Sequence, residues 1–106
     1  HIHLNDDALG ALIKWQNQSQ SKTYVFIGKQ GNKLTDVKTT FNTLLKDAGI
    51  TGFRFHDLRH DFASQLVKEG VDLNTIRELL GHSDLQMTMR YAHLAPNIKA
   101  EAVELL

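Results

Sequence analysis

Residues 56–82 read HDLRHDFASQLVKEGVDLNTIRELLGH, and their apolar side chains recur at helical spacing in two successive blocks. The first block begins at Asp57 and ends at Gly70, a residue type that commonly terminates helices. The second block begins at residue 72 or 73 and ends at Gly81. The apolar positions are Leu58, Phe62, Ala63, Leu66 and Val67, then Ile76, Leu79 and Leu80. The spacing therefore predicts two helices joined by a short turn.

The segment before this stretch predicts a helix and a brief strand. Asn5 suits the N-cap of a helix over residues 6–17, whose acidic first turn complements the helix dipole. Residues 24–27 form a β-prone run closed by Gly28 and Gly31, which predicts one short strand that enters a turn. This strand is too short to form a sheet unaided.

Three further helices complete the predicted fold. Thr35 and Asp36 can start a helix that ends at Gly49, and residue 83 or 84 can cap a helix that runs to Tyr91. Pro96 separates a last amphipathic piece, whose apolar face comprises Ile98, Ala102, Leu105 and Leu106. The expected fold class is mainly α with one short β element.

Composition limits the classes of protein to which the chain can belong. Its 106 residues suit one domain or a piece of one, and 42% apolar with 23% charged residues is ordinary for a globular fold. Without cysteine there are no disulfides, thiolate zinc sites or cysteine nucleophiles, which fits a reducing compartment. Twelve basic and twelve acidic side chains cancel, and this neutrality taken alone argues mildly against a self-sufficient DNA-binding domain.

Three motifs in the second half of the chain carry chemistry. His56 and Arg59 form a His-x-x-Arg box, a Leu-Gly-His box ends at His82, and Tyr91 follows nine positions later. In this order the motifs resemble the tyrosine recombinase, or phage integrase, family, and the resemblance covers nearly the whole chain. It implies a multi-helix fragment of a DNA breaking-rejoining catalytic domain. It also implies site-specific DNA recombination or integration through a 3′-phosphotyrosyl intermediate, without a cofactor.

The first box has the properties of a phosphate-binding site. Arg59 and His56 lie three positions apart at a helix start, so both side chains can approach one phosphate. A guanidinium matches two non-bridging phosphate oxygens and stays charged at any working pH. The alternative for Arg59 is a surface salt bridge with Asp57 or Asp61.

The histidines of these boxes have several possible roles. His56 and His82 can each carry a proton or donate a hydrogen bond to phosphate, and the sequence leaves the two roles open. A structural cap is the alternative for His82, which directly follows Gly81. His60 and His56 have the spacing of two metal ligands on a helix, but no metalloprotease glutamate and no third ligand accompany them. We expect no metal, and interpret His60 as a residue that supports the site or packs.

Tyr91 is the candidate nucleophile. Attack of its oxygen on the scissile phosphorus would keep the phosphodiester energy in a covalent bond, so neither a metal nor a nucleotide is required. The alternative is a core tyrosine that packs beside Met87. Tyr24 lies in the β-prone run and is interpreted as structural.

The chain also departs from the family pattern. Family members have an earlier arginine box and a β-hairpin lysine that acts as general acid, and both would precede His1. Lys29 and Lys33 follow the first helix, where the family lysine does not lie, so neither is assigned this role. We therefore expect residues 1–106 to be the C-terminal portion of a recombinase catalytic domain, monomeric and inactive alone. By the resemblance, the full bacterial or phage-encoded enzyme would act on double-stranded DNA in the cytoplasm, associated with the nucleoid. It would assemble as a tetramer on paired sites, and its final helix would dock in cis or in trans.

A helix-turn-helix DNA-binding module without catalysis is the alternative function. Residues 73–80 and 85–92 would flank the turn. The recognition helix would carry Gln86, Thr88 and Arg90. Negative charge around it opposes phosphate contact, from Asp72, Glu78 and Asp84. A plain helical scaffold, the third interpretation, explains none of the ordered polar residues.

Overall fold

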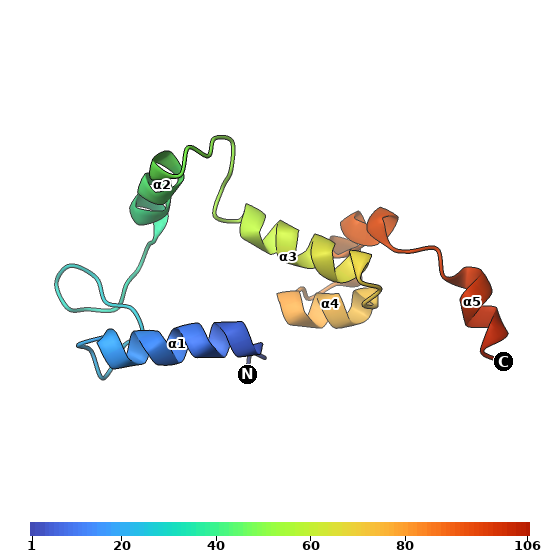
Figure 1. Cartoon of the computed structure of the whole chain (residues 1–106), viewed down its shortest axis with the longest axis horizontal. Helices are drawn as coiled ribbons and strands as arrows, with labels where there is room; N and C mark the ends of the chain where they lie inside the picture. The colour runs from blue at the N-terminus through green and yellow to red at the C-terminus, as the bar shows by residue number, and fades with distance from the viewer. The chain divides into compact units, whose positions relative to one another are not determined.

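A computed structural model describes all residues, 1–106 (Figure 1). They form two compact units, His1–Gly52 and Phe53–Leu106. The chain is mainly helical, and its only β feature is one isolated bridge in the first unit. This is the predicted fold class. No helix has both the length and the apolar character needed to span a membrane.

The first helix, α1, spans Asp6–Gln18 and confirms the helix predicted over residues 6–17. The Asn5 side chain accepts a hydrogen bond of 2.9 Å from the Ala8 N–H, which is the predicted N-cap. At the other end of α1, the Trp15 indole N–H donates to the Val25 carbonyl over 2.6 Å, and the Trp15 ring lies 5.9 Å from that of Phe26. Trp15 therefore fastens the following segment to the helix.

The strand predicted over residues 24–27 shrinks to a single antiparallel bridge between Ile27 and Lys33. The Gly28 N–H donates to the Asn32 carbonyl over 2.7 Å, and Gly31 adopts a φ of 77° that only glycine occupies readily. The β element is shorter than predicted because the turn closes after one residue pair and no third strand extends the pairing.

The second helix, α2, spans Lys38–Asp47 and begins two to three residues later than predicted. Asp36 nevertheless acts as the expected start signal, because its carboxylate accepts the Lys38 N–H over 2.8 Å. Gly49, at a φ of 70°, follows the end of the helix. No side chain of residues 1–52 is fully buried.

The second unit begins with α3, Asp57–Lys68, and α4, Leu73–Leu80, which confirm the two predicted helices. Asp72 caps α4 by accepting the Thr75 N–H over 2.9 Å, and Gly81 ends it at a φ of 69°. The two helices pack against each other and enclose the core of this unit. The buried apolar residues of the core are Ala63, Val67, Ile76, Leu80 and Tyr91.

The prediction of an α-helix that runs to Tyr91 is wrong. The segment instead forms two 3₁₀ pieces, η1 over Leu85–Met87 and η2 over Met89–Leu94, separated by Thr88. A 3₁₀ helix has three residues per turn, so Thr88 and Tyr91 face the same side, and both are buried.

The last helix, α5, spans only Lys99–Glu104 after Pro96. Its predicted apolar face stays open, because Ile98, Leu105 and Leu106 are all exposed. The structure therefore confirms the helix without showing what covers it.

Candidate active site

An open cleft of about 590 Å³ lies in the second unit, between side chains from α3, the turn after α4, η1 and η2. It is lined by His56, Arg59, His60, His82, Gln86, Met87, Arg90 and Tyr91. All five residues singled out in the motifs line this one cleft, whereas Tyr24 lies in the other unit. Three histidines and two arginines face the cleft and no carboxylate does, so it suits an anion.

Arg59 is half-buried on α3 and donates from Nη2 to the carbonyl of Leu80, at the C-terminal end of α4. Carbonyls at a helix end lack an intrahelical partner, and a guanidinium satisfies one of them here. The predicted alternative, a salt bridge from Arg59 to Asp57 or Asp61, is wrong. Because one N–H group of Arg59 is hydrogen-bonded to the backbone, the position of the guanidinium is fixed, and its remaining N–H groups can bind a ligand.

Asp57 instead pairs with Arg54, which precedes it in the turn before α3. The Arg54 Nη2 lies 3.0 Å from the Asp57 Oδ1, and the Arg54 backbone N–H donates to Oδ2 over 2.8 Å. These hydrogen bonds lower the pKa of Asp57 below its usual range and raise that of Arg54. The pair fixes the turn from which His56 and Arg59 project.

His60 contacts the candidate nucleophile directly. Its Nδ1 lies 2.6 Å from the Tyr91 hydroxyl oxygen, and the two rings are 6.0 Å apart. Tyr91 is only 6% exposed, so its position is fixed by the core as well as by this bond. Loss of hydration lowers the pKa of His60, and the nearby charges of Arg90 and His56 lower it further.

The contact between His60 and Tyr91 was not predicted, since it joins residues 31 positions apart. The predicted alternative for Tyr91, a core tyrosine, describes its burial correctly but omits its hydroxyl, which faces the cleft-lining His60.

His82 is held from two directions. Its Nδ1 lies 2.9 Å from the hydroxyl of Thr88, which is completely buried, and its carbonyl accepts from Arg77 Nη1 over 3.2 Å. Loss of hydration lowers the pKa of His82, and the charges of Arg59 and Arg90 add to the effect. Thr88 was not assigned to the site, and the signal that could have found it is its three-residue spacing from Tyr91.

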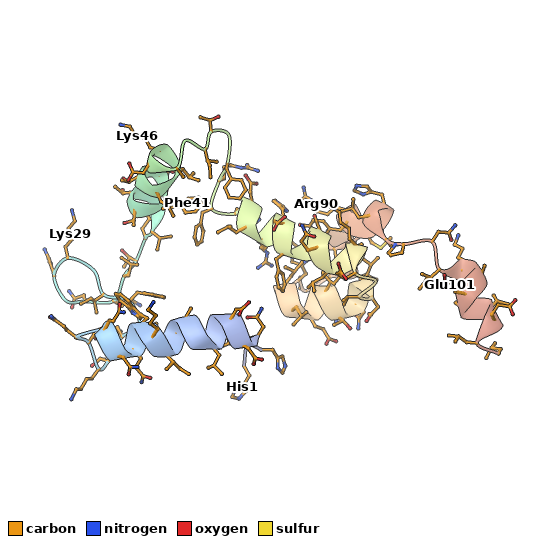
Figure 2. All side chains as sticks on the ribbon, viewed as in Figure 1. His1, Lys29, Phe41, Lys46, Arg90 and Glu101 are labelled. Atoms are coloured by element: carbon orange, nitrogen blue, oxygen red, sulfur yellow. The ribbon has the colours of Figure 1, made fainter.

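The remaining cleft residues differ in exposure. The His56 side chain is exposed, has no hydrogen bond, and meets the ring of His60 edge-on at 4.9 Å. Arg90, labelled in Figure 2, is also exposed, and its guanidinium carbon lies 5.6 Å from the centre of the Tyr91 ring. The sequence placed Arg90 only in the alternative recognition helix. No three histidine or acidic side chains are arranged to hold a metal ion.

Comparison with known proteins identifies a family and several relatives. A sequence model described as "Phage integrase family" matches residues 1–97. The integrase of Salmonella phage P22 is 52% identical over 62 residues, which cover 58% of this chain and 16% of that protein. The tyrosine recombinase XerC-like protein of Caldanaerobacter subterraneus subsp. tengcongensis is 40% identical over 88 residues, or 80% of this chain and 22% of the relative.

A solved structure is also similar. It is described as the catalytic domain of bacteriophage HP1 integrase, with a TM-score of 0.58 and 38% sequence identity. The match covers 73% of this chain and 48% of the solved chain. The chain thus spans about a fifth of the length of the two curated relatives and about half of this catalytic domain.

Proposed function

Because the chain belongs to the phage integrase family, we propose that it is the C-terminal portion of a tyrosine recombinase catalytic domain, part of an enzyme that cleaves and rejoins DNA at specific sites. One observation carries the proposal: Tyr91, Arg59, His56 and His82, named from their motifs, line a single cleft that no carboxylate enters. A nucleophile beside arginine and histidine side chains, in a cleft without a carboxylate, is suited to attack on a phosphodiester.

Arg59 is proposed to hold the scissile phosphate. Its anchored guanidinium presents the remaining N–H groups toward non-bridging oxygens, where charge builds as phosphorus is attacked. His82 has its Nδ1 committed to Thr88, which leaves Nε2 for the ligand. With Nδ1 accepting the Thr88 hydroxyl, neutral His82 carries its proton on Nε2 and donates it in a hydrogen bond to a phosphate oxygen. Exposed His56 supplies a further donor at the cleft edge.

Tyr91 is proposed to act as the nucleophile. As its oxygen bonds to phosphorus, the bond from phosphorus to the 5′ oxygen breaks, and a 3′-phosphotyrosyl link remains. The 5′ oxygen takes a proton from an acid outside this chain, for which the family's hairpin lysine is the expected source. Attack by a 5′ hydroxyl on the phosphotyrosyl link then reverses these changes and rejoins the strand. The energy of the phosphodiester is conserved throughout, so no nucleotide is consumed.

The helix-turn-helix alternative has no support in the fold. It requires a second helix over residues 85–92, and that segment consists of two short 3₁₀ pieces interrupted at Thr88. A recognition helix needs a continuous exposed face to enter the major groove. Here Thr88 is completely buried instead.

The same proposal extends to partners. The full enzyme would bind double-stranded DNA in the cytoplasm, associate with the nucleoid and assemble as a tetramer on paired sites, while this chain alone stays monomeric. This chain alone should bind DNA weakly, because its charge is balanced overall. That binding should be lost steeply as salt rises, because it depends on contacts between basic side chains and phosphates.

A nicked suicide substrate tests the proposed function. The nick lets the fragment beyond the cleavage point diffuse away, so the covalent intermediate accumulates. The full recombinase that contains this chain should form a protein–DNA adduct, and peptide mapping should locate the DNA on Tyr91. An adduct on Tyr24, or tight sequence-specific binding without any adduct, would contradict the assignment.

A further inference from the structure

The phenolic proton of Tyr91 must leave when its oxygen bonds to phosphorus, and the structure offers one acceptor for it. His60 Nδ1 lies 2.6 Å from the Tyr91 oxygen, at the short end of the range for hydrogen bonds. His60 is half-buried on α3, and Tyr91 is held in the core, so both partners are fixed. The contact is therefore already at the distance over which a proton transfers.

The other titratable groups of the cleft are not placed for this role. His82 uses its Nδ1 to contact Thr88, and His56 is exposed and touches only the ring of His60. No carboxylate lines the cleft. Of the two acids on α3, Asp57 is bonded to Arg54 and Asp61 accepts a hydrogen bond from Gln65. His60 alone touches the reacting oxygen.

Building on the proposed function, we propose that His60 is the general base of the cleavage step. The Tyr91 O–H bond breaks as a bond from His60 Nδ1 to hydrogen forms, the Tyr91 oxygen bonds to phosphorus, and the 5′ oxygen leaves. That oxygen takes its proton from a separate acid, the ammonium group expected from the rest of the enzyme. On rejoining, the 5′ hydroxyl gives its proton back to that amine and bonds to phosphorus, the phosphotyrosyl bond breaks, and His60 returns its proton to Tyr91.

The surroundings of His60 keep it ready to accept a proton. From η2 it faces Arg90 and Tyr91, and from the start of α3 it faces His56, Asp57 and Arg54. Loss of hydration and these mainly positive neighbours lower its pKa, so it is neutral at pH 7. A phosphate held by Arg59 brings negative charge close by, which favours the imidazolium formed during attack.

The hydrogen-bond direction can be measured on this chain without any reaction. In ¹⁵N-labelled protein, NMR should show neutral His60 protonated on Nε2, with Nδ1 accepting from Tyr91. Tyr91→Phe should raise the pKa of His60, because a donor to the neutral ring is removed. Tyr24→Phe is the matched control and should leave the His60 signals unchanged. A neutral His60 protonated on Nδ1 would overturn the proposal, since that nitrogen could not then accept.

Cleavage rates of the full recombinase distinguish two roles of His60, proton transfer and positioning of Tyr91. His60→Asn keeps an oxygen acceptor near the position of Nδ1 but cannot take a proton. It should slow adduct formation on nicked DNA by about 100-fold or more, the usual contribution of a general base. The exposed His93→Asn is the control and should react at the wild-type rate. His60→Asn with the wild-type rate and pH profile would mean that His60 only positions Tyr91, which overturns the base role.

Chemical rescue distinguishes the loss of a base from misfolding of the variant. His60→Ala opens space at the cleft wall, so added imidazole should restore part of the lost rate, and the gain should follow the neutral imidazole concentration. Tyr91→Phe should not respond. If imidazole fails to rescue a folded His60→Ala, the base role is wrong while the nucleophile assignment stands. An adduct formed by Tyr91→Phe would instead overturn the proposed function itself.

Discussion

The two units of the chain use their apolar side chains in opposite ways. Five apolar side chains are buried together within Phe53–Leu106, whereas none is fully buried within His1–Gly52. In the first unit Leu9, Ile13 and Phe26 each remain about half exposed. Local bonds hold that unit, such as the Asn5 cap and the bond from Trp15 to Val25.

The difference between the units fits the location of the proposed site. A catalytic site needs side chains held within a fraction of an ångström, and a packed core provides that rigidity. Tyr91 belongs at once to the core and to the cleft, and Thr88, which holds His82, is completely buried. Substitutions in the two units should therefore have unequal effects, and matched pairs test this.

The two tyrosines give the largest contrast. Tyr91→Phe in the full recombinase removes only the oxygen proposed to attack phosphorus, so covalent adduct should disappear while DNA binding persists. Tyr24→Phe, its counterpart in the first unit, should leave adduct formation unchanged. Gel analysis of adduct beside a DNA-binding assay measures both. Strong loss of cleavage with Tyr24→Phe would contradict the assignment of the catalytic residues to the second unit alone.

Two cations give the next contrast. Arg59→Lys keeps the charge but loses the fork of donors and the bond to the Leu80 carbonyl, so cleavage should slow by about 100-fold or more. Lys33→Met, in the turn of the first unit, should change the cleavage rate by less than about threefold, a surface-charge effect. Single-turnover rates on nicked DNA compare them. A collapse of cleavage in Lys33→Met would show that this lysine belongs to the active site after all.

Substitutions in the two units should also differ in their effect on the free energy of unfolding. Ile76 is completely buried, and Ile76→Ala should lower the free energy of unfolding by about 2–5 kcal/mol through lost contacts and a cavity. Ile13 is 50% exposed, so Ile13→Ala should cost about 1 kcal/mol or less. Urea unfolding followed by circular dichroism gives both values. Equal losses would mean that the first unit depends on packing as much as the second.

The smallest effect concerns pH. The lowered pKa values of His60 and His82 mean that the unfolded chain binds more protons below the ordinary histidine pKa of about 6.5. The stability that they contribute is complete above that value and is lost as pH falls toward the lowered values. Unfolding measured between pH 7.5 and pH 5 should show this decline, and the double variant His60→Asn/His82→Asn should flatten it. An unchanged slope in that variant would assign the decline to other groups.

Local signals made most of the fold predictable. Caps and glycines mark helix ends within a few residues of sequence, and Asn5, Asp72, Gly70 and Gly81 all lie where the helix boundaries were expected. The segment up to Tyr91 was misassigned to an α-helix because spacings of three fit both an α-helix and a 3₁₀ helix over so short a run.

The candidate site was predictable in its members but not in its contacts. Motif order identified His56, Arg59, His82 and Tyr91, and the structure brings them to one cleft. The bond from Arg59 to the Leu80 carbonyl and the contact of His60 with Tyr91 join distant positions, and tertiary packing alone determines them.

The 3₁₀ segment fixes how many residues can separate the last two motif residues. With three residues per turn, each added or deleted residue rotates everything after it by about 120°. One such change between His82 and Tyr91 would turn the phenol away from His60 and carry Thr88 or Tyr91 out of the core. The turn over residues 28–32 is closed by one bridge and carries no site residue, so it could lengthen freely. In-frame insertions or deletions of one residue should therefore be absent from the interval between His82 and Tyr91 and common in the turn over residues 28–32.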